Sequence, residues 1–539
     1  MRKTTVVFVA TGLAAAIVSL SAQERVEGET YWKIRREAQS NSQILKTVHV
    51  LTDVYGPRLT GSPSLKAAGE WAIEQMTAWG LQNAHLEPWD FGHPGWTNEH
   101  LAVHIIAPVK DALVVEALAW TPGTNGPVRG GAVLITVPSQ PTRDVLTAHL
   151  DTLKAAVRGK FVLVGSPQQV LVTFERPPLR REDRDVQSQF GTPGPAAAVA
   201  APAAAAATPA ASANAPLSTN EIDEQVNRFL LANGALGRVN DAGRDHGQIR
   251  AFSNRTYDPA TATPTVVMRN EDYGRIARLL ADGRSVELEF DIVNRIYPEG
   301  RTSYNTIAEI PGTDRASEVV MLGAHLDSWH SATGATDNAI GCAIMMEAVR
   351  ILKTVGARPR RTIRIALWSG EEQGLLGSQA YVRDHFGMFE NPKPEYQNFA
   401  GYFNVDSGTG RVRGLTVFGP EAAARILREA VTPLKDLGVA GAAATRSRQR
   451  GGTDSTSFNE AGLPGIGTQL DPIQYQTYTW HTNLDTYERI IEDDVKKSAM
   501  AIASAIYHLA MRDDMLPRFS TETMPPPTPP PGQGRGGRP

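Results

Sequence analysis

Short apolar runs alternate with helix-length stretches between residues 303 and 508, and this alternation restricts the possible folds more than any other feature of the chain. Four runs have the length and β-branched content of buried strands, at residues 305–309, 318–323, 362–367 and 402–405. Apolar residues at helical spacing extend from Ala339 to Thr354, and a second helical pattern begins near Leu376. Strands that alternate with helices predict an α/β domain with a mixed, mostly parallel sheet flanked by helices.

Length, charge and cysteine content exclude some classes of protein. The chain has 539 residues, which is more than one hydrophobic core usually holds, so we expect more than one domain. Its formal net charge of −3 mixes both signs without a basic block, which argues against nucleic acid as a partner. The single cysteine, Cys342, excludes an intrachain disulfide. Because apolar neighbours raise the pKa of a thiol, we interpret Cys342 as inert rather than as a nucleophile.

Both ends of the chain differ in composition from its centre. Arg2 and Lys3 precede an apolar stretch at 6–20, which predicts a signal peptide over residues 1–22. This stretch is shorter than the ~20 residues of a membrane span, so export to the periplasm or the extracellular space is favoured over an uncleaved anchor. After processing we expect no stable membrane span. Residues 519–539 are rich in Pro and Gly and are predicted to be a disordered tail.

The segment between residues 130 and 295 differs from the α/β region in its sequence pattern, and it is predicted to be an inserted, β-rich domain. Short β-branched runs at 132–136 and 160–164 indicate strands. The insertion divides the α/β domain into residues 23–129 and 296–518. Within the insertion, residues 191–216 contain mainly Ala, Pro and Ser, which is typical of a disordered loop.

Five polar segments stand out in the α/β region, and most of them lie at or near the end of a predicted strand: residues 323–327, 335–341, 368–374, 403–407 and 480–486. Because open α/β sheets bind ligands at the carboxyl ends of their strands, we expect their ionisable side chains to meet there. These are four carboxylates and two imidazoles: His325, Asp337, Glu371, Glu372, Asp406 and His481.

Charge repulsion decides between the interpretations of this cluster. A single segment has ordinary explanations, such as a buried hydrogen-bonded His–Asp pair or glutamates at a helix start. Four converging carboxylates repel and must take up protons unless a cation neutralises them. Mixed histidine and carboxylate ligands suit zinc, and two ions ~3.5–4 Å apart clamp both oxygens of a hydrolytic transition state. The combination therefore predicts a two-metal site.

The order of the motifs also resembles a known family. His-x-Asp, Asp-Asn-Ala-x-Gly, Glu-Glu, Asn-x-Asp and a late His follow one another as in the di-zinc aminopeptidase family, which includes leucyl aminopeptidases and glutamate carboxypeptidases. Residues 58–62 and 69–71 resemble its carboxypeptidase Q branch most. The resemblance implies a zinc-peptidase fold of the phosphorylase/hydrolase-like type. Motifs at 159–164, 233–237 and 265–267 resemble the protease-associated domain, which implies this identity for the insertion.

The resemblance assigns a role to each residue of the cluster. It implies that Asp337 bridges two Zn²⁺ ions. It also implies that the peptide bond between Asp337 and Asn338 is cis, as it is in relatives. The remaining ligands divide into His325 with Asp406 on one ion, and Glu372 with His481 on the other. Glu371 is the implied general base, and Asp327 is expected to orient His325 through its second ring nitrogen.

Other residues near these segments keep two interpretations. Asp485 either supports the site or caps a following helix, and Asp454 either faces a substrate amine or makes a turn. His330 is interpreted as pocket wall rather than as a third imidazole ligand. Either Tyr475 or Tyr478 has the chemistry to donate a hydrogen bond to an oxyanion, and the sequence does not choose between them.

These observations lead to one main prediction of function and several alternatives. The main prediction is an exported, zinc-dependent exopeptidase, with an aminopeptidase favoured and a carboxypeptidase Q-like dipeptidase or carboxypeptidase as the alternative. A non-catalytic binding protein on this fold would lack ligands, and all five are present. A cyclotransferase on the same fold would bind one zinc ion. We expect peptides as substrates, and the resemblance further implies a homodimer.

Overall fold

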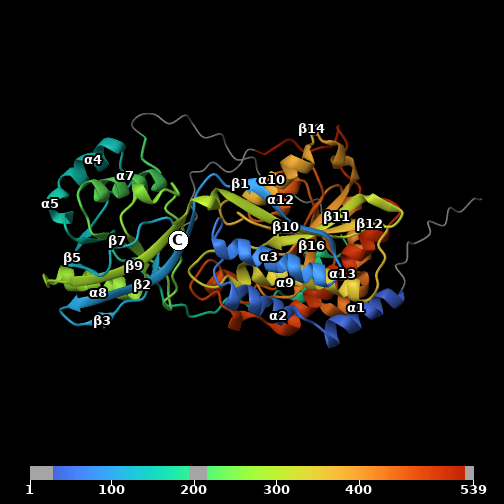
Figure 1. Cartoon of the computed structure of the whole chain (residues 1–539), viewed down its shortest axis with the longest axis horizontal. Helices are drawn as coiled ribbons and strands as arrows, with labels where there is room; N and C mark the ends of the chain where they lie inside the picture. The colour runs from blue at the N-terminus through green and yellow to red at the C-terminus, as the bar shows by residue number, and fades with distance from the viewer. Residues whose placement is uncertain (1–27, 193–214, 529–539) are drawn as a thin grey trace, which may run out of the picture.

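The computed structural model describes residues 28–192 and 215–528, and it contains two eight-stranded sheets that lie side by side (Figure 1). The predicted signal peptide and most of the predicted Ala/Pro loop fall outside the described residues. Among the described residues, no helix is both long enough and apolar enough to cross a membrane.

The first sheet is mixed, as the sequence predicted. Its strand order is β1-β10-β12-β11-β15-β18-β16-β17, and four of its seven neighbouring pairs are parallel. The strands are β1 (Gln82–Asp90), β10 (Thr302–Ile310), β11 (Arg315–His325), β12 (Arg361–Trp368), β15 (Phe399–Asn404), β16 (Val412–Phe418), β17 (Ala442–Thr445) and β18 (Gly465–Leu470). The four predicted strands correspond to β10, β11, β12 and β15.

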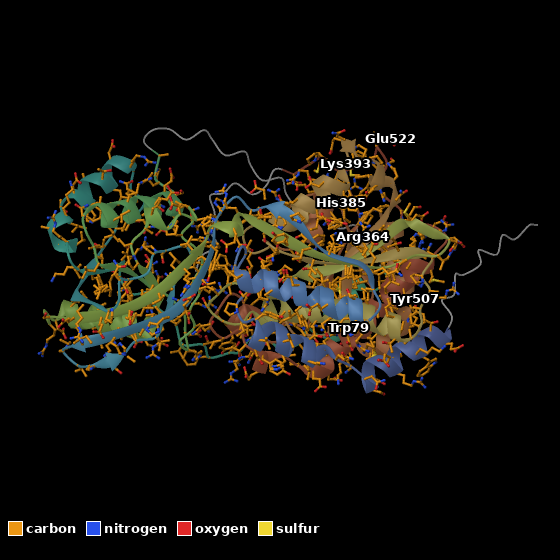
Figure 2. All side chains as sticks on the ribbon, viewed as in Figure 1. Trp79, Arg364, His385, Lys393, Tyr507 and Glu522 are labelled. Atoms are coloured by element: carbon orange, nitrogen blue, oxygen red, sulfur yellow. The ribbon has the colours of Figure 1, made fainter. Side chains whose placement is uncertain are left out.

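Helices cover both faces of this sheet. One face packs against α1 (Gly28–Ser40), α2 (Ile44–His49), α3 (Pro63–Ala78), α9 (Ile340–Thr354), α11 (Glu421–Val431) and α13 (Glu492–Met511). The opposite face packs against α10 (Leu376–His385) and α12 (Ser455–Glu460), where Trp368, Tyr381, Tyr402 and Phe458 form an aromatic core. Arg364 on β12 bridges β10 and α10, because it donates to Glu309 and to the Tyr381 hydroxyl; Figure 2 labels this arginine.

Short elements connect these layers. They are η1 (Val50–Val54), η3 (Pro298–Arg301), η4 (Ala335–Ala339), β13 (Gly387–Met388), β14 (Asn391–Pro392), η5 (Pro394–Asn398), η6 (Thr432–Leu437), η7 (Tyr475–Thr479) and η8 (Tyr487–Arg489).

The second sheet has the order β3-β2-β9-β5-β6-β7-β8-β4. Its strands are β2 (Gly95–Ala107), β3 (Asp111–Ala112), β4 (Val115–Ala117), β5 (Val128–Ile135), β6 (Phe161–Val164), β7 (Gly237–Asp241), β8 (Thr265–Met268) and β9 (Glu287–Tyr297). The helices that occur between these strands in the chain are α4 (Arg143–Asp151), α5 (Lys154–Val157), α6 (Asp183–Phe190), α7 (Thr219–Ala232), α8 (Asn270–Ala281) and η2 (Pro259–Thr261). The sheet therefore begins at Gly95, well before the predicted start at 130, because β2 pairs with β9 along almost its whole length.

Three glycines form the junction between the two sheets. A Cβ atom at Gly95 would lie 2.0 Å from the Gly61 carbonyl oxygen, and one at Gly300 would lie 2.3 Å from the Gly95 nitrogen. Because these distances are far below van der Waals contact, any larger side chain would separate the strands from the loop that precedes α3.

Helix α6 belongs to the middle of the chain but packs against β16 and β17 of the first sheet. Phe190 is fully buried there, and a Cβ atom at Gly414 would lie 2.3 Å from its ring. The nearby Arg413 donates to Asp471 and to Asp183 at the start of α6. Helix α6 therefore forms a second contact between the central segment and the first sheet, in addition to the glycine junction. The sequence of α6 did not indicate this contact.

The described part of the C-terminal tail makes specific contacts, although its composition predicted disorder. Phe519 is 6 % exposed, and the Arg446 guanidinium lies over its ring at 4.6 Å. Arg448 also donates to the carbonyl oxygen of Pro525. Apolar side chains within the tail thus anchor residues 519–525 on the first sheet's domain, and Figure 2 labels Glu522 in this segment.

Candidate metal centre

The ends of parallel strands bring the six predicted side chains together. His325 is the last residue of β11, Glu371 and Glu372 follow β12, and Asp406 follows β15. Asp337 lies in η4, just before α9. His481 follows η7 and has a left-handed backbone, with φ of 60°. The Asp337–Asn338 peptide bond is cis.

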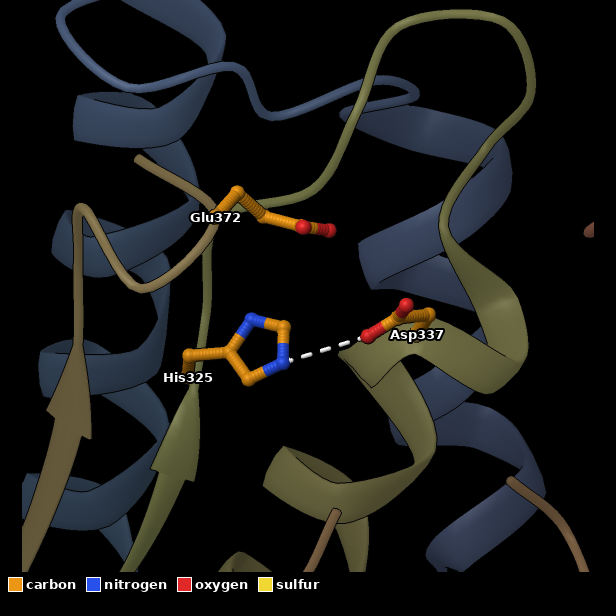
Figure 3. Close-up of side chains that lie close together, drawn as sticks. All are labelled: His325, Asp337 and Glu372. Carbon is orange, nitrogen blue, oxygen red and sulfur yellow. Dashed lines mark ion pairs between the residues drawn. The ribbon is translucent and has the colours of Figure 1, made fainter. Parts of the chain in front are cut away.

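Asp337 lies between the two histidines. Its Oδ1 is 3.2 Å from His325 Nε2, and its Oδ2 is 3.2 Å from His481 Nε2. Figure 3 shows Asp337 facing His325, with the Glu372 side chain extending into the space beside this pair. A carboxylate that presents one oxygen to each imidazole has the arrangement of a ligand shared by two metal ions.

The other carboxylates divide between the two histidines. Glu372 Oε2 is 3.0 Å from His481 Nε2, whereas Asp406 Oδ1 is 3.8 Å and Glu371 Oε2 is 4.0 Å from His325 Nε2. Two groups of side chains have ligand atoms within 4.8 Å of one another: His325 with Asp337 and Glu372, and His325 with Glu371 and Asp406. His325 therefore takes part in both groups.

The hydrogen-bonding state of these atoms fits a bound cation. His325 Nε2, Asp337 Oδ2 and Glu372 Oε1 are buried and make no hydrogen bond with any described residue. Buried polar atoms are otherwise almost always paired, since an unpaired one costs about 1–3 kcal/mol. Imidazole nitrogens and carboxylate oxygens that converge without hydrogen bonds are the donor set that zinc prefers.

The electrostatics of the cluster lead to the same conclusion. Burial raises the pKa of Glu371 well above its ordinary value and that of Glu372 to about 7. Burial also opposes a charged His481, but the carboxylates of Glu372 and Asp337 raise its pKa to about 10. In the absence of a cation, the cluster thus holds protons that a divalent ion would displace.

Asp327 does not contact His325 in the expected way. His325 Nδ1 lies 3.0 Å from the backbone carbonyl oxygen of Asp327 and 3.7 Å from its carboxylate. The carboxylate instead accepts hydrogen bonds from the backbone N–H groups of Glu371 and Glu372 and from the Thr60 hydroxyl. The predicted orientation of His325 is therefore corrected: the backbone carbonyl performs it, because the carboxylate is engaged by the loop after β12.

Asp485 supports the position of Asp337. Its carboxylate accepts from the backbone N–H of Thr336 at 2.6 Å and from that of Asp337 at 3.0 Å. Of the two interpretations left open by the sequence, the structure selects support of the site. Since both hydrogen bonds are made with the backbone of η4, Asp485 fixes the backbone position from which the Asp337 side chain extends.

Arg58 braces the loop that connects His325 with Asp337. Its fully buried guanidinium donates to the carbonyl oxygens of Leu326, Thr333 and Gly334, as well as to those of Leu51 and Gly56. The sequence marked residues 58–62 only through a resemblance, and no local pattern could reveal this role.

The cluster opens into a pocket of about 740 Å³, which we call the catalytic pocket. Its lining includes Tyr475 and excludes Tyr478, so the structure separates the two tyrosines. The pocket is lined by Asp337, Glu371, Glu372, Gly374, Leu375, Asp406, Ser407, Arg450, Gly451, Gly452, Tyr475, Gln476, Trp480 and His481. Arg450 is the one lining residue with a permanent positive charge.

Two other candidate residues lie outside the catalytic pocket. His330 is half-buried, and its Nε2 lies 2.6 Å from the carbonyl oxygen of Ala117 on β4, so it joins the two sheets rather than adding a ligand. Asp454 is fully buried and does not line the pocket, which does not favour contact with a substrate amine.

The segment after β7 packs against two residues that line the catalytic pocket, Trp480 and His481. Phe252 packs edge-on against His481, with ring centroids 5.4 Å apart. Arg250 donates to the carbonyl oxygen of Trp480, and its guanidinium lies 4.4 Å from the Trp480 ring centroid. Sequence patterns did not single out either residue, because their contact with the site depends on how the two sheets are placed.

Comparison with known proteins identifies the region that carries this cluster. Residues 305–506 match the model of Peptidase family M28, and they include all six side chains of the cluster. The chain is 26% identical to carboxypeptidase Q of Mus musculus over 511 residues, which is 94% of this chain and 91% of the relative.

Solved structures show the same fold at low identity. The peptidase M28 precursor of Shewanella amazonensis SB2B superposes with a TM-score of 0.63 and 23% identity, over 92% of this chain and 98% of that one. The zinc aminopeptidase BSAP of Bacillus subtilis superposes with a TM-score of 0.54 and 18% identity, over 88% and 96% of the two chains. The predicted mixed α/β fold is thereby confirmed.

Proposed function

Because residues 305–506 form a peptidase family M28 domain, we propose that the protein is a di-zinc exopeptidase that hydrolyses terminal bonds of peptides. The observation that carries this proposal is the position of Asp337, which presents one carboxylate oxygen to each of two histidines. The neighbouring Glu371 makes the cluster hydrolytic rather than merely structural, because it adds a carboxylate beyond the five proposed ligands.

The five ligands divide between two ions in the proposed enzyme. Asp337 would be shared, His325 and Asp406 would hold one ion, and Glu372 and His481 would hold the other. Support comes from the 3.0 Å approach of Glu372 to His481 and the 3.8 Å approach of Asp406 to His325. Asp327 and Asp485 keep these ligands in place through the backbone of the loops that carry them.

Catalysis then depends on the chain's own acid and base groups. Zinc in such a site supplies Lewis acidity to a water molecule and to the scissile carbonyl. Glu371 takes a proton from the attacking water, and the same carboxyl returns it to the leaving amine. Burial raises the pKa of Glu371, which makes its carboxylate a stronger base than an exposed one. Tyr475, which lines the catalytic pocket, donates a hydrogen bond to the developing oxyanion.

Two terminal specificities compete. An aminopeptidase is the first candidate, and the fold shared with the Bacillus subtilis zinc aminopeptidase is compatible with it. A carboxypeptidase or dipeptidase is favoured by Arg450, which can pair with a terminal carboxylate, whereas every acidic residue lining the catalytic pocket is a proposed ligand or the base. Similarity to carboxypeptidase Q over 94% of the chain supports this second candidate.

Three further proposals concern the whole protein. The second sheet is a protease-associated domain whose segment after β7 packs against Trp480 and His481 beside the active site. Residues 1–22 direct export to the periplasm or beyond, as their charged start and short apolar run support. Two copies of the chain assemble as a homodimer. Sequencing the N-terminus of the exported protein and measuring its mass in solution test the last two proposals.

The decisive experiment combines a substrate panel with one variant. Purified protein is incubated with aminoacyl chromogenic substrates, N-blocked peptides and free dipeptides, with and without a chelator. We expect chelation to abolish hydrolysis, and Glu371→Gln to retain zinc while it loses turnover by about 10²–10⁴-fold. Glu74→Gln, on the exposed side of α3, is the matched control. Full activity of Glu371→Gln would disprove its role as the base.

A further inference from the structure

A second cavity of about 670 Å³ adjoins the catalytic pocket, and we call it the polar pocket. The two share Asp406, Ser407, Arg450, Gly451 and Gly452, so the polar pocket begins beside the metal centre. The remaining lining is Asn404, Thr416, Thr445, Ser447, Gln449, Thr453, Ser455, Thr456, Asn459, Gly467, Thr468 and Gln469.

The chemistry of this lining is uniform. Every lining residue is polar or a glycine, and no aliphatic or aromatic side chain takes part. The only charged members are Asp406 and Arg450, both at the boundary with the catalytic pocket. Binding sites for small molecules are normally lined by apolar side chains with a few polar groups. These side chains offer hydroxyl and amide groups to a ligand that forms hydrogen bonds without carrying a charge.

Strand register explains where the pocket has its floor. Asn404 on β15, Gly467 on β18 and Thr416 on β16 are direct neighbours in the ladder, so they form one row across three strands. Directly opposed residues of neighbouring strands have side chains on the same face of the sheet. Helix α12 covers this row and contributes Ser455 and Asn459.

Gly467 leaves the middle of this row empty. A Cβ atom at this position would have only one heavy atom within 4 Å, the Ser455 hydroxyl oxygen at 3.5 Å. Neither backbone conformation nor packing therefore requires a glycine here. The effect of the glycine is to open the floor of the pocket between two polar side chains.

Ser455 supplies a hydrogen-bonding group at the same place. The residue is 4 % exposed, and its hydroxyl makes no hydrogen bond with any residue that the structure describes. The hydroxyl of Thr468 at the rim, in a residue 8 % exposed, also has no partner among the described residues. Buried polar groups without a protein partner need one from solvent or ligand.

We infer that the polar pocket is the substrate subsite that accepts an uncharged, hydrogen-bonding side chain of the peptide, namely a hydroxyl or carboxamide as in Ser, Thr, Asn or Gln. This inference rests on the proposed exopeptidase function and adds its side-chain preference. An aliphatic side chain in the pocket would displace water from hydroxyl and amide groups and leave them unpaired, so such substrates are selected against.

The test uses pairs of nearly isosteric substrates. Peptides that differ only in Thr against Val, or in Asn against Leu, are prepared with the variable residue on either side of the scissile bond. We expect kcat/KM of the zinc-loaded protein to be higher for Thr and Asn by about tenfold or more at one of the two positions. Equal rates within each pair at both positions would overturn the inference while leaving the exopeptidase function intact.

Variants of the pocket floor locate the preference. Gly467→Val fills the open space, so kcat/KM for the Thr and Asn peptides should fall about tenfold, while a peptide with Gly at the same position is unaffected. Thr416→Val removes a hydroxyl of the row and should reduce the Thr/Val ratio. Thr306→Val is the matched control, because its buried hydroxyl on β10 has no partner and lies outside both pockets.

The outcomes separate the inference from the function on which it rests. Zinc content is measured for each variant, so a loss of metal is not taken for a loss of subsite binding. Unchanged selectivity of Gly467→Val with unchanged zinc would overturn the inference alone. Failure of the zinc-loaded wild-type protein to hydrolyse any peptide of the panel would overturn the exopeptidase function and this inference together.

Discussion

Replacing Asp485 by Asn tests whether the backbone around Asp337 positions the metal ligands. Asp485 is 3 % exposed and accepts two backbone N–H groups, of Thr336 at 2.6 Å and of Asp337 at 3.0 Å. An asparagine keeps one acceptor oxygen but turns an NH₂ group towards the second N–H. One charge-assisted hydrogen bond, worth about 1.5–3 kcal/mol, is therefore lost.

This loss acts on the metal site because both hydrogen bonds lie in η4. If the Asp337 carboxylate is displaced, it is no longer correctly positioned to bind either of the two proposed ions. Changes of residues that support metal ligands lower metal affinity about 10–100-fold, which corresponds to about 1.4–2.8 kcal/mol and agrees with the loss of one hydrogen bond. Zinc affinity is measured by titrating the metal-free protein in competition with a chromophoric chelator.

Asp272→Asn is the control for this experiment. Asp272 is 4 % exposed, accepts the backbone N–H of Val114 and pairs with Arg269 in the second sheet's domain. The same chemical change there should lower stability without changing zinc affinity. If Asp485→Asn bound zinc as tightly as the wild type, or if both variants lost affinity equally, positioning of Asp337 by Asp485 would be refuted.

Three further predictions concern the oxyanion, the first sheet and pH. Tyr475→Phe should lower kcat about 10²-fold or more, whereas Tyr478→Phe, outside the catalytic pocket, should change kcat little. Steady-state kinetics on one peptide compares the two variants, and equal effects would contradict the assignment of Tyr475. Gly323→Ala places a Cβ atom 2.1 Å from the Ala366 carbonyl oxygen, between β11 and β12. Denaturant unfolding should therefore show that the free energy of unfolding falls by about 3 kcal/mol or more. A variant as stable as the wild type would contradict this steric account. Burial raises the pKa of Glu116 to about 8; the folded protein then binds the extra proton between pH 4.5 and 8, and stability falls as pH rises through this range. Glu116→Gln should remove this loss, which is about 4 kcal/mol at pH 8 for a shift of this size, and an unchanged pH profile of unfolding would show that Glu116 is not the group responsible.

Much of the first sheet's domain could be predicted from its sequence. The strands β11, β12 and β15 are rich in apolar residues because both faces of the sheet are covered by helices, and this content helped to predict them. β10 is more mixed, with Asn305, Thr306 and Glu309 among its residues. Chemistry follows directly from topology in such a sheet, since the residues after parallel strands meet at one edge. The types and order of His325, Asp337, Glu371, Glu372, Asp406 and His481 were therefore sufficient to predict a common cluster.

Sequence patterns were less informative where pairing is non-local. The β2–β9 ladder joins Gly95 with Tyr297 across the whole intervening segment, so the second sheet starts earlier than composition indicated. The docking of α6 on β16 and β17 depends on glycines that admit Phe190, which no local pattern shows. The tail after residue 519 was predicted to be disordered from its Pro and Gly content alone, yet the buried Phe519 and the contacts of Arg446 and Arg448 hold its described part in place.

The sequence by itself determined which chemistry we propose for the protein: the side chains of the proposed metal ligands and of the proposed base, most of which strand ends bring together. Only the tertiary structure decided how that chemistry is held and directed. Asp485 and Arg58 support the ligands through backbone groups of distant loops, and Gly467 opens a pocket whose other walls come from neighbouring strands and α12. The physical reason is that hydrogen bonds and steric contacts act between atoms in space, whereas hydrophobic periodicity reports only on residues close in the chain.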